Sequence, residues 1–452
     1  GGRLGESVLT PRAGASIAAG GGAPEGGFER VDGVLSCRGV SLERLAHDFG
    51  TPLYVYDLEG IEERVRRTQA AFAGVPTLVA YSVKANGSLA LLNRIGALGA
   101  GADIVSLGEL RRAIRAGIPA DRIVFAGVGK TEEELEAGLE TGIRSFHVES
   151  EGELDLLSKV AHRRGIPAPV GLRVNPDVSS GDGHEYVRTG HAHSKFGIPV
   201  SEAERLYRER VDDPGLEFRG VDVHIGSQIL ETGPFLRALA AILDMIDRLM
   251  QAGVHLGYVD LGGGFGVGYD GEPGFELEAF AEGVVPRLKE RDLSLVVEPG
   301  RSIVAEAGML LTKVLYLKEA PGKTFVVTDG GMTELVRPSL YGGFHRVTPV
   351  RWREGAEEVR ADVVGPVCES GDFLARDRSI RRPEPGDVLA VETAGAYGFT
   401  MASNYNARRR PAEVMIEDGR PALIRSRETF EDLMRGEVIP PRKGARRGGG
   451  DE

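Results

Sequence analysis

The sequence predicts an α/β protein in which a (β/α)8 barrel of the TIM type is joined to a second, mainly β domain. Between residues 52 and 301, apolar segments of strand character alternate with amphipathic helical segments, and eight such units are what a barrel requires. After residue 308 the alternation ends, and β-rich segments separated by Pro and Gly turns follow. This change of pattern predicts a second domain of a different class.

The domain boundaries follow from these changes in pattern. We place the barrel at residues 57–308 and the β domain at residues 309–440. Residues 28–56 contain strand-like pieces that we expect to join the β domain, so that the barrel is inserted between two parts of it. Residues 1–27 and 441–452 are rich in Gly and poor in apolar side chains, and we predict that both are disordered tails.

The barrel elements alternate in a regular order. We expect strands near residues 78–83, 102–106, 122–127, 145–149, 169–174, 219–225, 258–262 and 294–298, and helices at residues 89–98, 108–116, 131–140, 151–164, 201–210, 235–251 and 277–291. A doubly wound open sheet is the alternative assembly of the same units. The barrel is favoured because reactive residue types stand at the C-terminal end of nearly every strand, and these ends converge on one mouth.

Composition excludes several classes of function. The net charge of −12 argues against nucleic acid as a partner. The chain has no apolar run long enough for a membrane span, and its first residues lack the pattern of a secretory signal. The two cysteines, Cys37 and Cys368, form neither a disulfide framework nor a zinc site. We therefore expect a cytoplasmic protein.

The first catalytic candidate is Lys84, which ends the strand at residues 78–83. Burial disfavours the charged form of an amine, so a lysine held in a cleft becomes nucleophilic nearer neutral pH. Such an amine forms Schiff bases with carbonyl compounds, including pyridoxal phosphate. A surface lysine after an edge strand is the alternative, and this segment alone does not separate the two.

Two further strand ends suit a phosphorylated cofactor. Consecutive glycines at Gly262–Gly264 let backbone N–H groups approach a phosphate, although plain turns are also glycine-rich. Glu298 can keep a pyridine nitrogen protonated, Gly300 can add a backbone donor, and the Arg301 guanidinium suits a carboxylate or a phosphate. A simple Glu–Arg ion pair at the barrel rim is the alternative.

The remaining candidates are a histidine, a cysteine and their neighbours. His224 can stack on an aromatic cofactor while Ser227 reaches its phosphate, and a hydrogen-bonded barrel histidine is the alternative. In the β domain, Cys368 can deliver a proton and Glu369 can bind an ammonium group, unless this is a loop without a role. The pair His191 and His193 lacks the spacing of a metal site, so we expect no metal.

Six of these segments occur in the order seen in pyridoxal-phosphate decarboxylases with an alanine-racemase-like barrel. Among these enzymes the sequence most resembles the diaminopimelate decarboxylases, over residues 31–437. The matching segments are Tyr81–Asn86, His224–Ser227, Gly262–Gly266, Glu298–Arg301, Cys368–Asp372 and Gly395–Tyr397.

The resemblance implies pyridoxal 5'-phosphate as the cofactor and a role for each matching residue. Lys84, His224 and Cys368 are the implied catalytic residues, with Lys84 bonded to the cofactor, His224 stacked on its ring and Cys368 as proton donor. The implied cofactor-binding set is Lys84, His224, Ser227, Gly263, Gly264, Glu298, Pro299, Gly300, Arg301 and Tyr397. The implied substrate-binding set is Arg301, Arg337, Tyr341, Glu369 and Tyr397.

The resemblance also implies a reaction and an assembly. Arg301, Arg337 and Tyr341 would receive a distal carboxylate and Glu369 a distal ammonium, which suits the decarboxylation of meso-2,6-diaminopimelate to L-lysine and CO2. Cys368 and Glu369 would come from the partner subunit of a homodimer. Ornithine and arginine decarboxylases, which typically carry Asp after the cysteine, are the nearest alternatives. An amino-acid racemase, a decarboxylase of carrier-bound amino acids and a small pyridoxal-phosphate carrier are the others.

Overall fold

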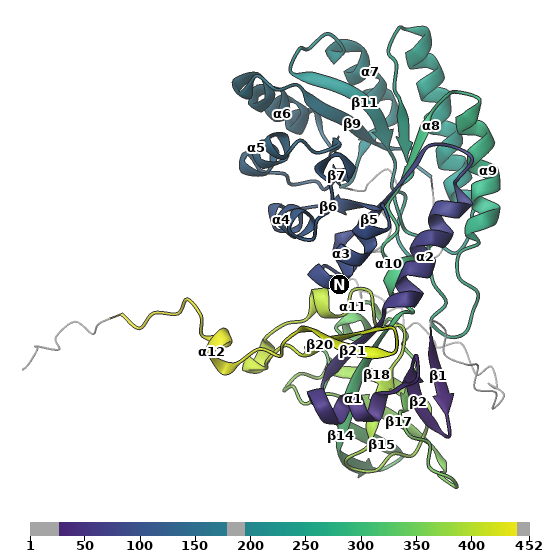
Figure 1. Cartoon of the computed structure of the whole chain (residues 1–452), viewed down its shortest axis with the longest axis vertical. Coiled ribbons are helices and arrows are strands. Elements are labelled where there is room, and N and C mark those ends of the chain that lie inside the picture. Colours follow the sequence, from purple (N-terminus) through teal and green to yellow (C-terminus); the bar gives the residue numbers. More distant parts are fainter. Residues whose placement is uncertain (1–26, 179–194, 441–452) are drawn as a thin grey trace, which may run out of the picture.

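Eight parallel strands close into a barrel that forms one half of the molecule (Figure 1). β5 is hydrogen-bonded to β13, which closes the ring and excludes the open sheet. In order around the barrel the strands are β5 (Thr77–Ser82), β6 (Gly101–Ile104), β7 (Ile123–Phe125), β8 (Ser145–Val148), β9 (Ala168–Asn175), β11 (Leu216–Asp222), β12 (Tyr258–Asp260) and β13 (Ser294–Val297). The predicted barrel is confirmed, and each strand lies within a few residues of its expected place.

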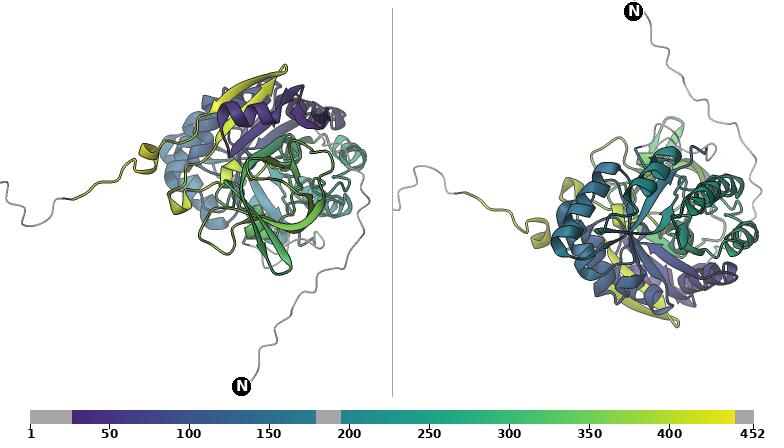
Figure 2. Two further views of the ribbon diagram at one scale, coloured as in Figure 1. Left: turned by 90° about the horizontal axis from the view of Figure 1, so that it is seen from below. Right: turned by 90° about the horizontal axis from the view of Figure 1, so that it is seen from above.

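Helices surround the barrel, as the view from above in Figure 2 shows. They are α2 (Leu58–Ala71), α3 (Leu89–Ala97), α4 (Leu107–Arg115), α5 (Glu132–Thr141), α6 (Glu151–Arg164), α7 (Val200–Arg210), α8 (Gly233–Gln251) and α9 (Leu277–Lys289). Local signals explain their limits. The side chain of Thr131 accepts from the Glu134 N–H in a capping box at the start of α5, and Gly142 ends that helix in the left-handed conformation. α2, which precedes the first barrel strand, was not among the expected helices.

The second half of the molecule is a mixed sheet with the strand order β18-β17-β15-β14-β4-β20-β21. Its strands are β4 (Leu53–Asp57), β14 (Gly308–Ala320), β15 (Lys323–Thr328), β17 (Glu358–Val364), β18 (Phe373–Arg381), β20 (Ala412–Glu417) and β21 (Arg420–Arg425). β16 (Val347–Pro349) and β19 (Val388–Val391) pair with each other, and β19 also pairs with β14. The mainly β character predicted for this part is confirmed.

The computed structural model describes residues 27–178 and 195–440. The predicted tails lie outside this part of the chain, except for Gly27, and so does the pair His191 and His193. The other described elements are β1 (Phe28–Val31), β2 (Val34–Cys37), β3 (Val40–Ser41), β10 (Ile198–Pro199), α1 (Leu42–Phe49), α10 (Arg301–Val304), α11 (Arg337–Tyr341) and α12 (Phe430–Leu433). No helix in the described residues has the length and apolar character needed to cross a membrane.

β4 joins the start of the chain to the β domain. It runs antiparallel to β14 on one side and parallel to β20 on the other, and all five of its residues are buried. Leu53 and Val55 face a core that includes Met309, Leu311 and Val414. Tyr54 and Tyr56 face the opposite core. A strand buried on both faces reads as a continuous apolar run, and this is what residues 53–56 show.

Removing apolar volume from β4 tests its central place in this sheet. We expect Leu53→Ala to lower the free energy of unfolding by about 3 kcal/mol, because the side chain is fully buried and leaves a cavity. The matched control is Leu423→Ala on β21, where the side chain is 50% exposed and the loss should stay within about 0.5 kcal/mol. Urea unfolding measures both. Equal losses would contradict the central position of β4.

Candidate active site

Lys84 stands at the mouth of the barrel, in a short turn directly after β5. Its Nζ donates to Asp103 Oδ2 at 2.7 Å, and the same carboxylate oxygen accepts from Ser82 Oγ at 2.7 Å. The side chain is 36% exposed, so the amine can be reached from the mouth. Asp103 lies on β6 and is itself buried. The strand-end lysine is therefore partly exposed at the mouth, with a carboxylate as its immediate partner.

The expectation that the pKa of Lys84 lies below its ordinary value is wrong. Burial lowers the pKa of Lys84, but the nearby charges of Asp103 and Glu298 outweigh it, so the pKa lies above its ordinary value. The sequence argument considered only the loss of water around the amine. Neighbouring carboxylates come from other strands and favour the ammonium form. Without a ligand, Lys84 is therefore a paired ammonium rather than a free nucleophile.

His224, which follows β11, is a neutral histidine with a fixed orientation. Its Nδ1 accepts a hydrogen bond from the Gly263 backbone N–H at 3.1 Å. Burial, together with the positive charges of Arg173 and Lys84, lowers the pKa of His224 to about 3. The remaining ring proton is therefore assigned to Nε2. A neutral, oriented ring at the barrel mouth suits contact with an aromatic ligand.

Glycines bring three loops of the mouth into backbone contact. Gly264 has a φ of +93°, and a Cβ on it would lie 2.0 Å from the Gly226 carbonyl oxygen. A Cβ on Gly263 would lie 2.0 Å from the Glu298 carbonyl oxygen. Any side chain at either position would push the loops apart. The loops after β11, β12 and β13 therefore meet only because these residues are glycine, and Gly300 makes a similarly close approach to Ser82.

Arg301 begins α10 and is buried beside two aromatic rings. Its guanidinium donates to Tyr269 Oη at 2.6 Å and to Ser227 Oγ at 3.1 Å, and it lies 4.8 Å from the centre of the Tyr397 ring. Both hydrogen-bond partners are neutral groups. The positive charge of Arg301 therefore remains available to an anion at the mouth.

Arg337 begins α11 in the β domain and lies against the same tyrosine. Its guanidinium lies 4.6 Å from the Tyr269 ring centre and donates to His345 Nε2 at 2.7 Å. Burial and the charge of Arg337 lower the pKa of His345 to about 3, and His345 Nδ1 donates to the Glu392 carbonyl oxygen at 2.9 Å. The electrostatic effect of Tyr341 on Arg301 and on Arg337 is in the direction that raises the pKa. Two buried guanidiniums with neutral hydrogen-bond partners thus form a receptor for a carboxylate or phosphate.

Tyr397 connects the β domain to the end of β5. Its backbone N–H donates to the Ala85 carbonyl oxygen at 2.8 Å, and the Asn86 side chain donates to the Gly395 carbonyl oxygen at 3.1 Å. Tyr397 has a φ of +55°, a conformation that costs energy for a bulky residue and must be held by its surroundings. The segment Gly395–Tyr397 is therefore fixed directly beside Lys84.

Cys368 and Glu369 are both exposed. The Cys368 backbone N–H donates to Asn406 Oδ1 at 3.1 Å. Buried Asp372 accepts from the N–H groups of Met332 and Val367 at 2.7 and 2.6 Å, which anchors this loop in the β domain. Within the described ranges, no hydrogen bond or ion pair joins Cys368 or Glu369 to the residues of the barrel mouth. One copy of the chain brings together the other predicted site residues but not these two.

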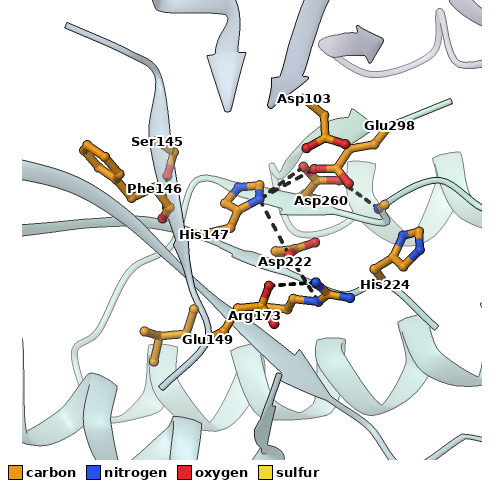
Figure 3. A network of polar contacts seen from close by, with 12 residues as sticks. Asp103, Ser145, Phe146, His147, Glu149, Arg173, Asp222, His224, Asp260 and Glu298 are labelled. Carbon is orange, nitrogen blue, oxygen red and sulfur yellow. Dashed lines mark hydrogen bonds and ion pairs between the residues drawn. The ribbon is translucent and has the colours of Figure 1, made fainter. Parts of the chain in front are cut away.

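Sequence reasoning missed a group of buried polar residues inside the barrel, which Figure 3 shows. His147, Asp222 and Asp260 are buried and lie near Glu298. Arg173 donates to Glu149 Oε1 at 2.8 Å on the neighbouring side. A polar residue at an inward-facing position of an otherwise apolar strand is the signal that would have indicated them. Tyr269, the shared partner of Arg301 and Arg337, lies in a loop without such a signal.

The residues at the mouth fit pyridoxal phosphate. Lys84 supplies a primary amine for its aldehyde, and Glu298 supplies a buried carboxylate after β13 that can pair with the ring nitrogen. The neutral His224 ring offers a flat surface, and the glycine loops and Arg301 offer donors suited to a phosphate. These groups come from the ends of four strands, β5, β11, β12 and β13, which is where barrel enzymes bind their ligands.

Comparisons with known proteins agree with this geometry. Residues 58–305 match the family model of the pyridoxal-dependent decarboxylases, pyridoxal binding domain. The diaminopimelate decarboxylase of Pseudomonas aeruginosa is 48% identical over 414 residues, which are 92% of this chain and 99% of that protein. That of Neisseria meningitidis serogroup B is 45% identical, over 89% of this chain and 97% of the relative.

Solved structures of relatives have the same fold. The diaminopimelate decarboxylase of M. jannaschii in co-complex with L-lysine is 37% identical, with a TM-score of 0.88 over 93% of this chain and 99% of that one. The Helicobacter pylori enzyme complexed with L-lysine is 40% identical, with a TM-score of 0.84 over 87% and 98%. The likeness extends over the barrel and the β domain together, and the chain therefore belongs to the diaminopimelate decarboxylase family of pyridoxal-dependent decarboxylases.

Proposed function

We propose that this chain removes one carboxyl group of meso-2,6-diaminopimelate as CO2 and releases L-lysine, with pyridoxal phosphate as its cofactor. The observation that carries the proposal is the pair of buried guanidiniums, Arg301 and Arg337, beside a lysine at the barrel mouth. A substrate whose far end bears a carboxylate needs such a receptor. The lysine complexes of the two solved relatives support lysine as the product.

Five residues are assigned to the cofactor in this proposal. Lys84 would hold it covalently, His224 would lie on the ring face, and Glu298 would bind the ring nitrogen. Gly264 and Gly300 would give backbone donors to the phosphate. When bound, pyridoxal phosphate supplies an electron sink for the bond that breaks at the α-carbon. The remaining contributions come from the chain, which orients the substrate, excludes water and places charge.

The substrate's distal end is assigned to the arginine receptor. Arg301 and Arg337 would bind its carboxylate, and Tyr341 at the end of α11 would complete the receptor. His345 accepts from Arg337 and so holds one edge of that guanidinium in place. Rigid placement of the distal carboxylate fixes the position of the α-carbon at the other end of the substrate.

We assign the proton donor of each active site to a second copy of the chain. Cys368 is an exposed, unpaired cysteine, and Glu369 beside it is also exposed. In a homodimer with shared sites, the Cys368 thiol of one subunit would protonate the substrate α-carbon at the barrel mouth of the other. Glu369 would receive the distal ammonium. We place this reaction in the cytoplasm, which suits two unpaired thiols.

A panel of amino acids tests the reaction. We expect CO2 release and L-lysine from meso-diaminopimelate, and little turnover of L-ornithine, L-arginine or either alanine enantiomer, because those substrates leave the arginine receptor empty. Released CO2 and the chirality of the product are measured. Lys84→Ala serves as the inactive control. Faster turnover of L-ornithine than of meso-diaminopimelate, or interconversion of the alanines, would contradict the proposal.

The arginine receptor is tested by Arg337→Gln. We expect kcat/KM for meso-diaminopimelate to fall about 10–100-fold, because one charge-assisted hydrogen bond to the distal carboxylate is lost. The dissociation constant for pyridoxal phosphate should not change. Arg351→Gln is the matched control, since Arg351 is an exposed arginine paired with Glu43 on the surface. An equal loss in cofactor binding would place Arg337 at the phosphate instead.

Shared active sites are tested by mixing two inactive variants, Lys84→Ala and Cys368→Ala. After subunit exchange in equal amounts, half of the dimers are mixed and each mixed dimer has one intact site, so activity should recover to about one quarter of the wild-type value. The mixture is assayed before and after exchange. If recovery fails although exchange is shown with differently tagged subunits, Cys368 acts within its own chain or not at all.

A further inference from the structure

Four buried side chains meet inside the barrel below the mouth (Figure 3). They are His147 on β8, Asp222 on β11, Asp260 on β12 and Glu298 after β13, and each is at most 3% exposed. His147 Nδ1 lies 3.6 Å from Asp222 Oδ2, 3.8 Å from Asp260 Oδ2 and 3.6 Å from Glu298 Oε1. One imidazole nitrogen therefore faces three carboxyl groups in a site closed to solvent.

Strand register forces these charges together. Asp222 is the direct partner of Asp260 on one side and of Arg173 on the other. Like charges on directly opposed residues destabilise a sheet, and buried charges without compensation cost several kcal/mol each. The cluster must therefore contain positive charge, or protons, close to the carboxyl groups.

The hydrogen bonds of His147 indicate where one of these protons lies. Its Nε2 lies 3.2 Å from Tyr258 Oη, and that hydroxyl donates onward to Ser145 Oγ at 2.8 Å. Because the Tyr258 hydroxyl donates its proton to Ser145 Oγ, it can only accept from His147, and Nε2 must be the donor. Nδ1 then faces only acceptors, and a bare lone pair there would be repelled by all three carboxyl groups. A proton on Nδ1 replaces this repulsion by ionic attraction to all three carboxyl groups.

A second proton is required by the charge count. The nearby cations are already paired, Lys84 with Asp103 and Arg173 with Glu149. A charged His147 then balances only one of the three carboxyl groups. Arg173 adds a longer contact, with its Nε 3.9 Å from Asp222 Oδ2. At least one of the three carboxyl groups must therefore be protonated to limit the buried negative charge.

The environments of the three carboxyl groups differ in a way that places this proton. Burial and the charges of Glu298 and Asp222 raise the pKa of Asp260 well above its ordinary value. Burial also raises the pKa of Asp222, to about 7. At Glu298 burial acts in the same direction, but the contact with His147 and the charge of Lys84 outweigh it and hold the pKa below its ordinary value. Asp260 is therefore the acid and Glu298 the anion.

We propose that His147 and Asp260 are positioning residues for Glu298, with His147 held as a buried imidazolium and Asp260 as a neutral carboxylic acid. Together they keep Glu298 ionised and fixed at the place where the ring nitrogen of pyridoxal phosphate is to bind. This inference rests on the proposed function, which assigns Glu298 to that nitrogen. The anion exists before the cofactor arrives, so no proton has to leave Glu298 when the cofactor binds.

A divalent cation is the other group that could satisfy the same atoms. All four candidate ligand atoms lie within 4.8 Å of one another. A cation would require Nδ1 to be unprotonated and all three carboxyl groups to be ionised. The imidazolium places a positive charge 3.6–3.8 Å from the same carboxyl groups without a further ligand, and the two arrangements predict opposite states of one nitrogen.

The first experiment uses the ligand-free chain, so its outcome does not depend on the proposed function. Histidine is labelled with 13C and 15N, and the His147 signals are assigned by their loss in His147→Gln and their shift in Tyr258→Phe. We expect both ring nitrogens to remain protonated from pH 6 to pH 8. A neutral His147 ring at pH 7, or its deprotonation on addition of Zn2+ alone, would overturn the inference.

The second experiment asks whether Glu298 depends on His147 and whether Asp260 acts as a neutral acid. Asp260→Asn keeps a neutral group of the same shape and should leave the dissociation constant for pyridoxal phosphate within about threefold, whereas His147→Gln should raise it about tenfold or more, which corresponds to one pKa unit at Glu298. The 15N signal of ring-labelled cofactor should stay that of a protonated ring in Asp260→Asn and move towards a neutral ring in His147→Gln.

The possible outcomes distinguish a failure of the positioning role of His147 from a failure of the proposed function. If His147→Gln folds and binds the cofactor as wild type does, with an unchanged 15N signal, the positioning role is overturned. If His147→Gln does not fold, the assignment through Tyr258→Phe still decides the protonation of His147 in the wild-type chain. If the ligand-free chain shows the imidazolium but Glu298→Gln binds the cofactor normally, the assignment of Glu298 to the ring nitrogen fails and the positioning role fails with it, while the buried charge arrangement stands.

Discussion

Backbone contact between three loops is the constraint on which the active site depends. Gly263 and Gly264 bring the loop after β12 against the carbonyl groups of Glu298 and Gly226. The same approach lets the Gly263 N–H bind His224 Nδ1, which fixes the imidazole and its protonation. An added methyl group at either glycine would separate residues that must act on one small molecule. Because these glycines have no side chain, the backbones of the three loops can touch.

The site also requires both halves of the chain. Arg301 comes from the barrel and Arg337 from the β domain, and Tyr269 contacts both guanidiniums. The segment Gly395–Tyr397 is hydrogen-bonded to the end of β5 beside Lys84. A barrel alone would present the lysine and the glycine loops with only one of the two buried guanidiniums. The β domain therefore supplies part of the polar surroundings of the barrel mouth.

Features that depend on local sequence pattern, such as the barrel strands, were predicted well. The barrel strands were found because each is a short apolar run with a reactive residue at its end, and the same pattern made Lys84, His224 and Glu298 candidates. The rise in the pKa of Lys84 was missed because Asp103 lies on another strand and is brought near only by the closed barrel. His147, Asp222 and Asp260 were missed because each is a single polar residue within its strand, and only the register of the closed barrel brings them together. The proximity of Arg301 and Arg337 was expected only through the resemblance, and Tyr269 between them was not expected at all.

The position of β4 in the sheet affects how the chain folds while it is synthesised on the ribosome. This early strand pairs with β14 and with β20, which are synthesised long after it. The barrel residues are synthesised after β4 and before β14 and β20. The barrel can therefore begin to form before either partner strand of β4 is available. During that interval the apolar faces of β4 are uncovered and its backbone groups are unpaired. Apolar surface and strand edges exposed in this way promote aggregation, and the interval ends when residues 412–417 leave the exit tunnel.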